Sequence, residues 1–141
     1  MMEQKKLTAI EKVIFLKSVD IFRNATIEVL GRVAALTEEV DYEPGETIFR
    51  KGEPTDAIYI ILSGRVAVEG NGQVVREVGE KQALGTVAAL DRNPAIQTVK
   101  AIDAVYALKL NAQDFDDILS LDFELVRAIF RALCRMIRAG Q

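Results

Sequence analysis

GTVAALDRNPAIQTVKA, the segment Gly85–Ala101, has the outline of an anion-binding cradle. A glycine opens a short apolar turn, a polar loop containing Pro94 follows, and a β-branched strand begins at Thr98. Backbone N–H groups at the start of such a turn point toward an anion, and the loop that follows closes over it. The segment therefore predicts an anion site held between two strands.

Working outward, short β-rich runs alternate with turn residues from Glu39 to Leu110. YEPGETIFRKG (Tyr42–Gly52) and DAIYIILSGRVAV (Asp56–Val68) supply strands and turn glycines. Asn71-Gly72 predicts a tight hairpin, because both residues tolerate positive φ. Many short strands with frequent turns indicate a sandwich or a barrel.

Together with FLKSVDIF (residues 15–22), these segments resemble the cyclic nucleotide-binding domain family over roughly residues 11–137. The family's phosphate-binding cassette usually reads Gly-Glu, an apolar turn, then Pro-Arg-Ala-Ala-Thr-Val. Gly85 and Pro94 match it, whereas Thr86 replaces the glutamate and Ala95 replaces the arginine. The resemblance implies a degenerate ligand-binding cassette formed by Gly85, Thr86, Val87, Ala88, Ala95, Ile96, Gln97 and Thr98.

The two replacements remove the side chains best suited to a cyclic nucleotide. An arginine donates two bonds to a phosphate and stays charged, and a glutamate accepts from a ribose hydroxyl. Hydrogen bonds to charged groups contribute about 1.5–3 kcal/mol each, so losing both costs about two to four decades of affinity. We expect a regulatory or sensor domain with reduced or lost cAMP and cGMP binding. Its ligand would then be a weakly bound cyclic nucleotide or another small anion.

Two alternatives stay open. The first is a working cyclic nucleotide sensor with a non-standard anchor, such as Arg65, Arg76 or a group from a partner chain. The second is a dimerisation or docking module without a ligand. In this family, ligand binding shifts the cassette and lets the last helix swing over the barrel. The resemblance also implies an attached output domain outside this chain.

The expected fold is mainly β: a jelly-roll barrel with flanking N-terminal and C-terminal helices. We expect a polar tail over residues 1–9, helices over 10–38, the jelly roll over 39–110 and helices over 111–141. Thr8 and Glu11 have the spacing of a capping box at the first helix. A chain of 141 residues fits one domain, which we expect to span residues 10–139.

The clearest helix spans residues 122–138. Its apolar stripe predicts a homodimer seam or a lid over the ligand site, with packing on the barrel as the plainer alternative; the stripe comprises Val126, Ile129, Leu133 and Ile137. A basic stripe is expected to be a solvated face; it comprises Arg127, Arg131, Arg135 and Arg138. Cys134, between apolar neighbours, is expected to be a buried thiol.

Composition excludes several function classes. With no histidine and one cysteine, the chain lacks the usual general base and the usual zinc ligands, so we expect no catalytic residue, no metal site and no cofactor. A net charge of −3 gives no general attraction to nucleic acid. No apolar run approaches a membrane span, and the N-terminus does not resemble a secretory signal. We expect a cytoplasmic regulatory protein.

Overall fold

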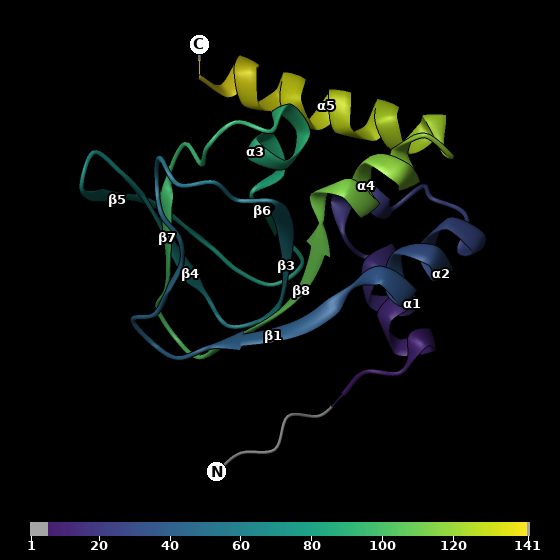
Figure 1. Cartoon of the computed structure of the whole chain (residues 1–141), viewed down its shortest axis with the longest axis horizontal. Helices are drawn as coiled ribbons and strands as arrows, with labels where there is room; N and C mark the ends of the chain where they lie inside the picture. Colours follow the sequence, from purple (N-terminus) through teal and green to yellow (C-terminus); the bar gives the residue numbers. More distant parts are fainter. Residues whose placement is uncertain (1–5, 141) are drawn as a thin grey trace.

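The computed structural model describes residues 6–140 and contains two four-stranded antiparallel sheets with helices around them (Figure 1). One sheet has the order β1-β8-β3-β6 and the other β2-β7-β4-β5. The strands are β1 Glu38–Tyr42, β2 Thr47–Phe49, β3 Ala57–Ser63, β4 Val66–Gly70, β5 Gln73–Val78, β6 Ala83–Leu84, β7 Thr98–Ala101 and β8 Val105–Asn111. The predicted jelly roll is confirmed, but its two sheets are not closed into a barrel.

Six helical segments flank the sheets within the described part of the chain. They are α1 Ala9–Lys17, the 3-10 helix η1 Asp20–Phe22, α2 Ile27–Leu36, α3 Thr86–Asp91, α4 Ala112–Leu119 and α5 Phe123–Ala139. Helix α1 begins one residue inside the stretch expected to be a polar tail, and residues 1–5 of that tail lie outside the described residues, as does residue 141.

Local capping explains where the helices begin. The Thr8 hydroxyl accepts from the Glu11 N–H at 3.1 Å while the Glu11 carboxylate accepts from the Thr8 N–H at 2.8 Å. This confirms the predicted capping box. Thr26 and Asp122 cap α2 and α5 in the same way, each accepting one N–H of the first helical turn.

Strand β3 separates two hydrophobic cores. Ile58 and Ile60 point into a core shared with the helices, whereas Tyr59 and Ile61 point between the two sheets. Successive side chains of a strand lie on opposite faces, so a strand covered on both faces must be apolar throughout. The continuous apolar run in β3 thus arises from burial on both sides, as the sequence predicted.

Helix α5 lies across the end of the sandwich near α3 and β6, while α1, α2 and α4 gather at one side (Figure 1). Leu125 and Ile129 bury against the helical core. Within residues 6–140, none of the helices combines the length and apolar character that crossing a bilayer requires.

Candidate functional site

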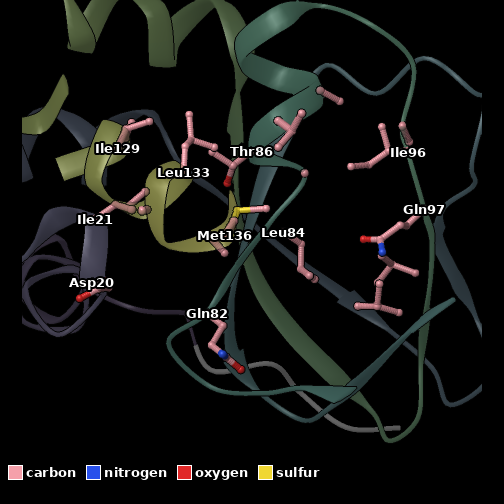
Figure 2. A pocket seen from close by; sticks show the side chains of 18 of the residues that line it. Asp20, Ile21, Gln82, Leu84, Thr86, Ile96, Gln97, Ile129, Leu133 and Met136 are labelled. Carbon is pink, nitrogen blue, oxygen red and sulfur yellow. The ribbon is translucent and has the colours of Figure 1, made fainter. Parts of the chain in front are cut away.

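A partly open cavity of about 280 Å³ lies between α5, the cassette and the end of the sandwich. Figure 2 shows Ile129, Leu133 and Met136 of α5 on one side and Ile96 and Gln97 of the cassette on the other. The walls are mostly apolar. They are lined by Val19, Asp20, Ile21, Phe49, Val68, Arg76, Lys81, Gln82, Ala83, Leu84, Gly85, Thr86, Val87, Ala88, Ala95, Ile96, Gln97, Val99, Ile129, Ala132, Leu133 and Met136.

Gly85 forms the turn into α3 and fixes how the cassette enters the cavity. Its φ is +82°, and a Cβ atom there would lie 2.9 Å from the Ala57 carbonyl oxygen. A side chain is therefore excluded by both the backbone conformation and a backbone neighbour. Helix α3 has only six residues, so its dipole gives little help to an anion.

Ala95 sits where the resemblance places the family's arginine, and it is only 4% exposed. Its N–H donates to the Glu53 carbonyl at 3.0 Å, and its carbonyl accepts from the Gly52 N–H at 2.8 Å. These bonds fix the cassette loop against the turn before β3. Ile96, the next residue, lies at the rim and is 57% exposed.

Seven of the eight cassette residues named from the sequence line the cavity. The eighth, Thr98, does not, because its hydroxyl accepts from the Lys51 N–H at 2.9 Å on the other side of the strand. Whether any of the eight contacts a ligand stays a prediction.

The apolar stripe of α5 divides between two environments. Ile129 is buried and Leu133 partly buried, and both line the cavity. Val126 is partly buried away from the cavity, and Ile137 is 62% exposed. Two neighbours that the sequence analysis did not assign to the site, Ala132 and Met136, complete this wall, and the i+3 and i+4 spacing from Ile129 and Leu133 was the signal for them.

The N-terminal segment supplies a wall that the sequence did not reveal. Val19, Asp20 and Ile21 line the cavity beside α5. The Asp20 carboxylate accepts from Arg135 at 2.6 Å and pairs with Arg23 at 3.2 Å. Only the folded chain brings these segments together, because Asp20 and Arg135 are 115 residues apart.

The two basic residues of the cassette segment point away from the cavity. Arg92 ends α3 and pairs with Asp116 of α4 at 2.7 Å. Lys100 pairs with Glu69 of β4 at 3.6 Å. Neither residue therefore substitutes for the missing arginine.

Of the two arginines considered from the sequence as non-standard anchors, only Arg76 lines the cavity. Arg65 instead pairs with Asp103 at 3.0 Å and with Glu77 at 3.1 Å. The hydrogen bond to Asp103, followed by its charge, raises the pKa of Arg65. Lys81, which the sequence analysis did not consider, also lines the cavity, so two cations reach its rim.

Cys134 is exposed, and the expectation of a buried thiol is wrong. An α-helix turns 100° per residue, so Cys134 lies about 140° around α5 from the buried Ile129. Its apolar neighbours in sequence therefore face other directions. Within residues 6–140, no three potential metal-ligating side chains of histidine, cysteine, aspartate or glutamate gather in one place.

The family model described as "Cyclic nucleotide-binding domain" matches residues 39–122. An uncharacterized NTE family protein of Mycobacterium tuberculosis is 32% identical over 127 residues, which cover 89% of this chain and 22% of that protein. The chain thus spans about a fifth of the length of this curated relative.

Two solved structures share the fold. The sensor domain of the transcriptional regulator DNR from Pseudomonas aeruginosa superposes with a TM-score of 0.79 at 20% identity, covering 90% of this chain and 89% of that one. The regulatory subunit of a cAMP-independent protein kinase A from Trypanosoma brucei gives 0.78 at 27% identity, covering 88% and 46%. With the family model matching more than half of the residues, the chain belongs to the cyclic nucleotide-binding domain family.

Proposed function

We propose that this chain is a regulatory sensor domain whose cavity has reduced or lost affinity for cAMP and cGMP. The observation that carries the proposal is Ala95, which is buried in the cavity wall at the position of the family's arginine. A methyl group there offers a phosphate neither charge nor a hydrogen-bond donor.

Thr86 adds to the loss at the other anchor position. It lies in the cavity wall, and its neutral hydroxyl is a weaker hydrogen-bond acceptor for a ribose hydroxyl than a carboxylate is. Losing both anchors corresponds to about two to four decades in affinity. The solved Trypanosoma brucei relative is described as cAMP-independent, which is consistent with a member of this fold working without cAMP.

Helix α5 is the element through which an occupied cavity would act on an attached domain. It supplies one cavity wall through Ile129, Leu133 and Met136, and it ends the described chain at Gly140. A ligand that fills the cavity contacts α5 directly and so changes how firmly the helix packs. A domain joined after residue 141 would receive that change. The family and the fold are regulatory rather than enzymatic.

The test is calorimetric titration of the chain with cAMP and cGMP. We expect dissociation constants of about 0.1 mM or weaker, because a micromolar site that loses both anchors weakens by at least two decades. A dissociation constant in the low micromolar range for either nucleotide would contradict the proposal.

Arg76 supports a second candidate function, a cyclic nucleotide sensor with a non-standard anchor. Among the described residues that line the cavity, Arg76 carries the only guanidinium, whose planar fork can donate two hydrogen bonds to a phosphate at once. If cAMP binds tightly in the same titration, Arg76→Gln separates the possibilities. The variant weakens binding by at least about tenfold if Arg76 is the anchor.

A ligand-free dimerisation module is a third candidate, and α5 carries the surface for it. Phe123, Phe130 and Ile137 repeat every seven residues and are 69%, 58% and 62% exposed. A seven-residue apolar repeat suits pairing with a second copy of the same helix. Sedimentation equilibrium of the chain and of Phe130→Glu tests this. A dimer that Phe130→Glu dissociates supports the dimerisation module. A chain that is still monomeric at about 100 μM contradicts it, because the dissociation constant of any dimer would then lie above that concentration.

A further inference from the structure

We propose that the cavity beneath α5 binds a small organic monoanion with an apolar body, an aryl- or alkyl-carboxylate. The carboxylate meets Arg76 and Lys81 at the rim, and the body fills the space between α3, α5 and the sandwich. This inference rests on the proposed function, because it names what the site takes once the cyclic nucleotide anchors are gone.

The position of Arg76 on β5 turns its side chain toward the cavity. Arg76 pairs in register with Val68 of β4, and both residues line the cavity. Val78, two residues further along β5, is buried between the sheets, so the same face of the strand points inward at Arg76. Arg76 is itself exposed, so its guanidinium lies at the open side of the cavity, where an anionic ligand can reach it.

Lys81 brings a second cation to the same rim. It lies in the turn between β5 and β6 with a φ of +71°, and the Lys81 N–H donates to the Ile61 carbonyl at 2.8 Å, which fixes the turn. Within residues 6–140, the side chains of Arg76 and Lys81 form no ion pair. Both cations are therefore available to a ligand.

The acidic group in the cavity wall does not cancel this charge. Asp20 is already paired with Arg135 at 2.6 Å and with Arg23 at 3.2 Å. Glu77, the neighbour of Arg76 on β5, points to the opposite face and pairs with Arg65 at 3.1 Å. The cavity therefore presents a net positive rim.

The walls behind that rim suit a hydrocarbon body. Leu84, Ala88, Val99 and Leu133 come from four different elements and converge on the space. A ribose and a purine carry several polar atoms, and each one buried against such walls without a partner weakens binding by about tenfold or more. An apolar body has no such atoms and gains from every buried methylene.

The volume limits the size of that body. About 280 Å³ lies just below the usual range of roughly 300–1,000 Å³ for small-molecule sites. A single ring or a short alkyl chain fits this space better than a drug-sized molecule.

The experiment compares matched acids and amides by calorimetry on the whole chain. The probes are 4-phenylbutyrate with 4-phenylbutanamide, and octanoate with octanamide, so that the aromatic and alkyl bodies are separate arms. Inorganic phosphate and cAMP are titrated alongside. We expect at least one acid to bind more tightly than its amide, and we expect phosphate, which has no apolar body, not to bind.

Two variants locate the site. Arg76→Gln combined with Lys81→Gln weakens binding of the acid by about twofold to thirtyfold, the range for two exposed ion pairs, and leaves binding of the amide unchanged. Arg32→Gln is the matched control, because Arg32 is an exposed arginine on α2 that does not line the cavity. Ala88→Leu fills the cavity and abolishes binding of acid and amide alike; circular dichroism verifies that it folds.

The outcomes separate this inference from the proposed function. If no acid binds better than its amide, or if the double variant binds the acid as well as the unchanged chain does, the inference is wrong while weak cAMP binding stands. If cAMP binds at low micromolar concentration, the proposed function itself is wrong, whatever the acids do.

Discussion

Arg135 of α5 donates a hydrogen bond of 2.6 Å to Asp20 of η1, and Asp20 lines the cavity that α5 covers. The same carboxylate also holds Arg23 at 3.2 Å. One ion pair therefore joins the covering helix to η1, the neighbouring wall of the cavity. A ligand that moves α5 away from η1 has to break this ion pair, whereas a ligand that leaves α5 in place does not.

Arg135→Gln tests whether this ion pair holds α5 in place. Both partners are more than half exposed, so the free energy of unfolding falls by only about 0.2–1 kcal/mol. We expect hydrogen exchange of the amides in the second half of α5 to accelerate, while β3 and β8 exchange as before. Arg138→Gln on the same helix is the control. Equal exchange in the Arg135 variant and the unchanged chain would show that the ion pair does not hold α5.

Gly64 holds the turn between β3 and β4 in a conformation that other residues rarely adopt. Its φ is +93°, and a Cβ atom there would lie 2.3 Å from the Ala104 carbonyl oxygen. Gly64→Ala must therefore move backbone as well as adopt an unfavourable φ. We expect urea denaturation to show a loss of about 2–4 kcal/mol in the free energy of unfolding.

Gly31→Ala is the matched comparison for that substitution. Gly31 lies inside α2, and an added Cβ atom meets nothing within 4 Å. Alanine lowers the entropy of the unfolded chain and favours the helix, so stability rises by about 0.5–1 kcal/mol. Opposite signs for the two glycines are the expected result, and a loss of stability in both would contradict the explanation.

Tyr42 makes the fold sensitive to alkaline pH. Burial, followed by the neighbouring Tyr59, raises the pKa of the Tyr42 phenol well above its usual value. The stability from this group is complete below the unfolded pKa of about 10. It is lost as pH rises above that value, because the unfolded chain ionises first.

Tyr42→Phe keeps the ring against Tyr59, whose centroid lies 6.4 Å away, and removes the ionisable group. Urea denaturation between pH 9 and 11 (roughly the window around the reference tyrosine pKa) compares the two proteins. The unchanged protein loses stability more steeply, by at most about 1.4 kcal/mol per pH unit for one proton. Parallel curves for the two proteins would show that Tyr42 does not titrate differently on folding.

Features set by neighbours in sequence could be predicted without the structure. Asn71 and Gly72 form the expected hairpin with φ values of 56° and 80°, because their backbone preferences act locally. Thr8 and Glu11 form the expected capping box for the same reason. The alternation of burial along β3 likewise follows from one apolar run.

Features that depend on strand register or distant segments could not be predicted. A register shift between Val68 and Glu69 interrupts the pairing of β4 with β5, so the sequence does not say which face of β5 carries Arg76. Thr98 does not line the cavity as expected, because its hydroxyl accepts a hydrogen bond from the N–H of Lys51, which is 47 residues away. Asp20 reaches the cavity only through packing of η1 against α5.

Restoring both family anchors is the most direct test of the degenerate cassette. Ala95 is 4% exposed in the cavity wall, so an arginine there has to project into the cavity, and Thr86 lies in the same wall. Thr86→Glu combined with Ala95→Arg adds one acceptor for a ribose hydroxyl and one bidentate donor for a phosphate. We expect calorimetry to show cAMP affinity rising by about two to four decades.

Asn93→Arg is the control for the introduced arginine, because it places a guanidinium at an exposed position of the cassette loop that does not line the cavity. Its effect on cAMP affinity is at most about fivefold, as for one exposed charge. A double variant that folds but gains no more than this control would show that missing anchors are not what weakens the site. A gain confined to the double variant means that the cavity retains the shape for a cyclic nucleotide and lacks only the groups that hold it.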